Sequence, residues 1–168
     1  MTMESEPPQA PEPTSVRRLL ALVKIDFDPK HEQPGWGQVL LATLVSLIGS
    51  LLADFILVRI GTALFPSTKY YVHFQFHDYA RLTIIGVLIA CAAWPVVTRI
   101  TSSPRWVFLR MAILVTLVLW LPDLYILSKG QPAKAVIILM VMHLAIALVT
   151  YNSLIRLAPA RPKATVTI

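Results

Sequence analysis

The sequence predicts an all-α fold: a polytopic membrane protein whose four transmembrane helices form an up-down bundle. Of its 168 residues, 56% are hydrophobic and only 14% are charged, whereas about 25% of the residues in a soluble domain are charged. The mean hydropathy is +0.66, and the apolar residues lie in long blocks, as in segments that cross a bilayer. The chain length suggests one domain. We therefore expect a single membrane domain.

Residues 1–35 are expected to form a disordered and juxtamembrane cytoplasmic tail. The first part is rich in glutamate and proline, a composition that cannot bury enough apolar area to fold. Residues 16–25 then place leucines next to Arg17, Arg18 and Lys24. Two interpretations fit this segment: a short basic amphipathic helix lying on anionic lipid headgroups, or an ordinary solvated segment beside the membrane.

Four apolar blocks make up the predicted transmembrane domain, residues 36–156. The first block contains a mainly apolar run from Val39 to Val58, close to the roughly 20 residues that a spanning helix needs. The predicted spans are residues 36–65, 82–98, 106–127 and 135–155.

The connections between these blocks predict the topology. Residues 99–105 and 128–134 are short and contain proline or glycine, so the spans that they join must be antiparallel neighbours. Residues 66–81 are rich in tyrosine and phenylalanine, which favour the membrane–water interface. Residues 157–168 are predicted to be a second cytoplasmic tail.

The positions of lysine and arginine predict a plasma membrane protein with both termini in the cytoplasm. Cationic segments beside membrane spans are retained on the cytoplasmic side. With the N-terminus inside, four loop cations lie outside and Arg59 lies at the outer end of the first span. The four are Lys69, Arg81, Lys129 and Lys134, and the ten on the inside are Arg17, Arg18, Lys24, Lys30, Arg99, Arg105, Arg110, Arg156, Arg161 and Lys163. Topology therefore explains the formal charge of +6, and no nucleic acid partner is expected.

Small residues at helical spacing predict where the helices pack. Lipid provides no hydrophobic drive for helix association, so close contacts require small side chains or polar contacts between helices. The first two spans contain such residues at three- and four-residue steps. They are Ser46, Gly49, Ser50 and Ala53 in the first span, and Gly86, Ala90 and Ala93 in the second.

A few ionisable residues inside the spans are the candidates for specific chemistry. A carboxylate at membrane depth is unfavourable by about 2.5 to 3.5 kcal/mol, so it usually faces the bundle interior or water. Asp54, Asp123 and His143, together with Arg59, are predicted to share an outward-facing polar cavity. In the functional interpretation, this cluster forms a proton-linked or ligand-binding site, because desolvated carboxylates and imidazoles change charge readily.

The same residues also have a structural interpretation, which we favour. In it, Asp54 pairs with Arg59 or Arg81 near the interface. Asp123 caps or disrupts the end of the third span after a proline, and His143 forms a hydrogen bond with a neighbouring helix. No specific chemistry follows from this arrangement.

No catalytic motif is found in the sequence. His73, His77 and Asp78 could approach a metal ion if their segment is helical, but no glutamate follows the first histidine as a zinc-protease motif requires. The single cysteine, Cys91, has no partner for a disulfide or a metal cluster. We therefore expect no enzymatic activity, no metal and no cofactor.

The second half of the chain resembles DUF6069, a family of small actinobacterial four-helix membrane proteins of unknown function. The resemblance covers residues 82–159. It rests on Ala92, Ala93 and Trp94, on Pro104 to Phe108, on Leu119 to Pro122, and on Met142, His143 and Leu144. It implies a membrane location and a four-helix fold, but no activity.

The sequence bears on three classes of function: a membrane subunit, a transporter or channel, and a membrane enzyme. The favoured prediction is a structural or accessory subunit that associates in the bilayer with other membrane proteins or with copies of itself through its small-residue faces. The alternative is a small proton-linked transporter or channel that uses Asp54. A membrane enzyme is the least supported, because no nucleophile, metal cluster or phosphate loop is present.

Overall fold

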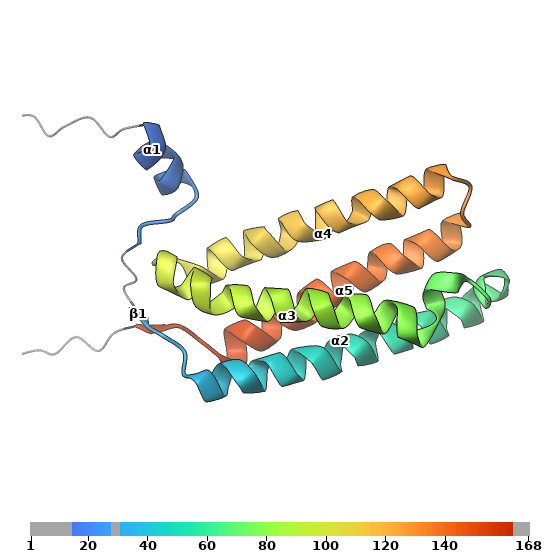
Figure 1. The fold of residues 1–168 in the computed structure, drawn as a ribbon, viewed down its shortest axis with the longest axis horizontal. Helices are drawn as coiled ribbons and strands as arrows, with labels where there is room; N and C mark the ends of the chain where they lie inside the picture. The colour runs from blue at the N-terminus through green and yellow to red at the C-terminus, as the bar shows by residue number, and fades with distance from the viewer. Residues whose placement is uncertain (1–14, 28–30, 163–168) are drawn as a thin grey trace, which may run out of the picture.

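A computed structural model describes residues 15–27 and 31–162, and four long helices dominate it (Figure 1). They are α2 (Trp36–Leu64), α3 (Phe76–Ile100), α4 (Pro104–Ser128) and α5 (Ala133–Leu157). Each is long and apolar enough to cross a membrane. The predicted all-α fold is confirmed, and the four helices indicate a multi-pass membrane protein. Most of the glutamate- and proline-rich segment lies outside the described residues.

Short elements lie at both ends of the bundle. Helix α1 (Ser15–Leu22) precedes strand β1 (His31–Glu32), which pairs antiparallel with β2 (Arg161–Pro162). The segments before α2 and after α5 therefore meet at one end of the bundle (Figure 1). At the opposite end, the 3-10 helices η1 (Pro66–Thr68) and η2 (Val72–Phe74) connect α2 to α3.

Helix α3 begins at Phe76, six residues before the predicted span starts at Leu82. Asp78 lies in the first turn, where a negative charge stabilises the positive end of the helix dipole. Tyr79 and Ala80 are buried in an apolar cluster with Tyr71 and Phe74. The polar and aromatic residues just before the predicted span thus extend its helix.

Helix α2 packs closely against α5. A Cβ atom at Gly49 would lie 2.9 Å from Cγ1 of Val149, and one at Gly61 would lie 2.4 Å from Cδ1 of Ile138. A side chain at either position would have to displace the α5 side chain that it meets, so the two glycines permit the close approach of α5. The contact turns one face of α2 inward, with Ala42, Ser46, Ser50 and Asp54 all fully buried.

The face of α3 that carries small residues points outward instead. Gly86 is exposed and Ala90 is half-buried, and a Cβ atom at Gly86 would meet no atom within 4 Å. Large apolar side chains flank this face, with Leu82 73% and Ile89 65% exposed. The small residues of α2 therefore pack within the chain, and those of α3 around Gly86 do not.

Substituting Gly49 by alanine is expected to lower the unfolding temperature relative to Gly86→Ala. Both variants gain helix propensity, but only the new methyl group at position 49 would overlap a neighbour, Val149. Overpacking of this kind costs about 1 to 3 kcal/mol. Thermal unfolding of the purified protein in detergent measures the difference, and equal unfolding temperatures would contradict the close contact of α2 with α5.

Candidate functional site

Asp54 lies on the inward face of α2 and is completely buried. The hydroxyl of Thr83, on α3, donates a hydrogen bond of 2.6 Å to Oδ2 of Asp54. The other carboxylate oxygen, Oδ1, is buried and has no hydrogen-bond partner among the described residues, and the same is true of the hydroxyl oxygen of Ser50 one turn earlier. A buried polar atom normally has a partner. Oδ1 of Asp54 is therefore an unusual polar atom, and it belongs to an ionisable group.

Asp54 does not pair with either arginine that the structural interpretation proposed. Arg59 lies over the ring of Phe55 at 5.0 Å and is exposed, as is Arg81. Within the described part of the chain, Asp54 forms no ion pair. For Arg59 the reason is helical geometry, because residues five positions apart point about 140° away from each other around an α-helix.

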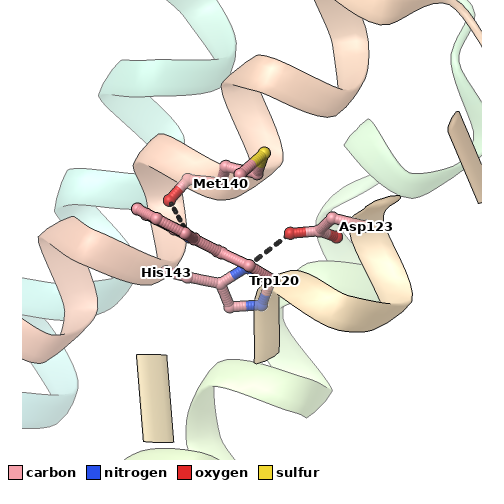
Figure 2. A network of polar contacts seen from close by, with 4 residues as sticks. All are labelled: Trp120, Asp123, Met140 and His143. Atoms are coloured by element: carbon pink, nitrogen blue, oxygen red, sulfur yellow. Dashed lines mark hydrogen bonds and ion pairs between the residues drawn. The ribbon is translucent and has the colours of Figure 1, made fainter. Parts of the chain in front are cut away.

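Asp123 and His143 form a second polar pair, which joins α4 to α5 (Figure 2). Nδ1 of His143 lies 3.0 Å from Oδ2 of Asp123. The Asp123 side chain is 7% exposed and that of His143 is 26% exposed. Next to this pair, Nε1 of Trp120 donates a hydrogen bond of 3.1 Å to the backbone oxygen of Met140. Two polar contacts thus connect the same two helices.

The expected role of Asp123 at the end of its helix is wrong. Helix α4 continues past Pro122 to Ser128, so Asp123 lies inside the helix and its carboxylate is available to α5. The expected hydrogen bond from His143 to a neighbouring helix is present, and its partner is Asp123 itself.

The connection between α2 and α3 brings an aromatic residue towards this pair. Tyr71 is buried, and its hydroxyl has no hydrogen-bond partner. Burial raises the pKa of the Tyr71 phenol, and the negative charge of Asp123 raises it further. The ring of His73 lies 5.3 Å from that of Tyr71, edge to face. Tyr71 was predicted only as an aromatic residue of the interface.

The four predicted site residues therefore do not form one contacting cluster. Asp123 contacts His143, whereas Asp54 contacts Thr83. Two clefts in the structure, of about 110 and 160 Å³, are lined by other residues. Thr83 was missed, although a threonine within a long apolar block is itself a signal of a polar partner in the bundle.

The three residues considered as metal ligands, His73, His77 and Asp78, are not arranged as a metal site. Nε2 of His77 lies 3.2 Å from Oδ1 of its neighbour Asp78, while His73 contacts Tyr71. In residues 15–27 and 31–162, no group of three or more histidine, cysteine, aspartate or glutamate side chains is arranged to hold a metal ion. Cys91 is buried as a free thiol.

A double-mutant cycle with Asp123→Leu and His143→Leu is expected to show coupling. A shielded polar pair should give an interaction free energy of about 0.5 to 3 kcal/mol. The matched control is His77→Leu with Asp78→Leu, a pair whose side chains are 64% and 31% exposed and should be coupled by less than about 1 kcal/mol. Unfolding in detergent measures both cycles. Equal coupling in the two would contradict a specific contact between α4 and α5.

Comparison with known proteins identifies a family but no characterised relative. The family of unknown function DUF6069 matches residues 29–160, which contain all four long helices. No curated protein and no solved structure matches the chain. The match covers more than the second half of the chain, to which the resemblance in the sequence is limited. It also includes α2 with Asp54. The chain therefore belongs to DUF6069, a family of unknown function.

Proposed function

We propose that this protein is a structural or accessory membrane subunit that associates with another transmembrane helix through the outward face of α3. The proposal rests on the open space at Gly86, where an added Cβ would meet no neighbouring atom of the described residues within 4 Å. The partner is a second copy of the chain or another membrane protein.

The pattern on α3 supports a helix as the partner. Gly86 and Ala90 are four residues apart, so they lie on one face. The side chains of Leu82 and Ile89 lie beside them and are exposed. Small residues on one helix face let a second backbone approach closely and make dispersion contacts. The corresponding strip on α2 is unavailable to a partner because Val149 and Ile138 of α5 occupy it.

We further propose that both termini are cytoplasmic in a plasma membrane protein, with the end of the bundle that contains β1 and β2 facing the cytoplasm. This end contains the end of α3 with Arg99, the start of α4 with Arg105 and Arg110, and the end of α5 with Arg156. The excess of cations at this end supports that orientation.

Replacing Gly86 by leucine is expected to abolish association. The added side chain would hold a partner helix away, and its Cβ atom would meet no atom of the described residues within 4 Å. The matched control is Gly37→Leu, since Gly37 is also in a helix and also has no neighbour within 4 Å. Chemical cross-linking in native membranes measures the complexes. Unchanged complexes in Gly86→Leu, with both variants at normal abundance, would contradict the proposal.

A second candidate function is proton-linked transport with Asp54 as the proton carrier. The unpartnered Oδ1 atom favours it, because a carboxylate that has only one hydrogen bond in the interior is poorly stabilised in its charged form. Thr83 would hold the carboxyl group in place through Oδ2, which leaves Oδ1 to receive the proton.

This second candidate predicts that Asp54→Asn loses proton flux while keeping its fold. Asparagine retains an acceptor for the Thr83 hydroxyl but does not titrate. Proton entry into vesicles, driven by a potassium diffusion potential and followed with an internal pH dye, gives the measurement. Asp78→Asn removes a more exposed carboxylate and is the control. Equal flux in Asp54→Asn and the unmodified protein would exclude Asp54 as the carrier.

A further inference from the structure

The segment that follows α1 is attached to the connection between α3 and α4. The backbone N–H groups of Asp26 and Phe27 donate hydrogen bonds of 3.2 and 3.0 Å to the oxygen of Ile100. The hydroxyl of Thr101 donates a hydrogen bond to the backbone oxygen of Lys24. The segment after α1 lies at the bundle end that contains β1 (Figure 1), and these hydrogen bonds give Lys24 a defined position.

The backbone conformation of this segment is unusual. Lys24 has a φ of 57° and Phe27 a φ of 53°, in the left-handed region that residues with a side chain rarely adopt. The hydrogen bonds to Ile100 and Thr101 hold these two residues in that conformation. As a result, the Lys24 side chain is directed towards the start of α4.

Two cations meet at one tryptophan there. Nζ of Lys24 lies 4.7 Å from the ring centre of Trp106, and the guanidinium carbon of Arg110 lies 3.6 Å from the same centre. The indole ring attracts both cations, but it carries no net charge to neutralise them. In the described part of the chain, neither cation forms an ion pair with a carboxylate.

Exposed apolar side chains lie near the two cations in the sequence. On the N-terminal segment, Leu22 is 72% and Phe27 66% exposed. On α4, Leu109 is exposed beside Arg110, and Ile113 follows one turn later. A tryptophan accompanied by cations and exposed apolar side chains is typical of the depth at which headgroups meet hydrocarbon.

We infer that Lys24, Trp106 and Arg110 form a binding site for the phosphate of an anionic phospholipid. The positive charges of Lys24 and Arg110 would neutralise the negative charge of the phosphate. The exposed side chains of Leu22, Phe27 and Leu109 would contact the acyl chains of the lipid. A soluble phosphate compound would satisfy the cations but not these apolar side chains. This site is separate from the α3 face around Gly86.

Lipid retention measured by native mass spectrometry tests the site. The full chain, purified in mild detergent, is mixed with equal amounts of phosphatidylglycerol and phosphatidylcholine. We expect the unmodified protein to retain phosphatidylglycerol preferentially. Lys24→Gln with Arg110→Gln should lower the ratio of retained phosphatidylglycerol to phosphatidylcholine on the order of tenfold, given the contribution of each cation near a membrane surface. Lys24→Arg with Arg110→Lys should keep the preference, because both charges remain.

The matched control removes two cations at the other end of the bundle. Lys129 lies 5.3 Å from the ring centre of Tyr125, and Lys134 lies 4.9 Å from that of Phe65. Lys129→Gln with Lys134→Gln therefore changes the net charge equally and removes the same kind of contact. An equal loss of preference in this control, or no loss in the Lys24 and Arg110 variant, would overturn the site.

Two further measurements test the role of Lys24 alone and the preference for a lipid over a soluble phosphate. The single variant Lys24→Gln should fold normally, because the hydrogen bonds that position residue 24 involve its backbone, and it should lose part of the preference. A preference in Lys24→Gln equal to that of the unmodified protein would contradict the role of Lys24.

An excess of glycerol phosphate should not displace phosphatidylglycerol. Displacement would show that a soluble phosphate suffices and would overturn the assignment to a lipid.

Discussion

The close approach of α2 and α5 is the contact on which the rest of the bundle depends. It requires Gly49 and Gly61, because Val149 and Ile138 occupy the space that side chains there would need. Since hydrocarbon does not drive apolar helices together, such contacts must come from shape and from polar groups. Once α2 lies against α5, its row of Ser46, Ser50 and Asp54 is enclosed.

With that row enclosed, the buried polar groups form contacts between helices. Asp54 reaches α3 through Thr83, while Asp123 and His143 connect α4 to α5. Each contact joins a different pair of helices, so the two carboxylates act on different interfaces. In this arrangement, the unpartnered oxygen of Asp54 is one of the buried polar atoms that packing alone does not explain.

The number and type of the long helices could be predicted because a spanning helix needs a long apolar run, and such runs are visible in the sequence. Asp123 and His143 were both predicted as site residues, since ionisable groups in apolar blocks are rare. Their pairing, and that of Asp54 with Thr83, could not be predicted because it depends on how each helix is rotated about its axis. For the same reason, the small residues of α2 and α3 looked equivalent, although only those of α2 pack within the chain.

The pairing of β1 with β2 also constrains the order in which the chain is assembled. Residues 31 and 32 are synthesised before α2, yet their partners, residues 161 and 162, follow the last helix. Nε1 of Trp94 likewise binds the backbone oxygen of Ala158. The ribosome must therefore synthesise all four long helices before these contacts can form. The pairing of β1 with β2 is for this reason a late step in the assembly of the protein.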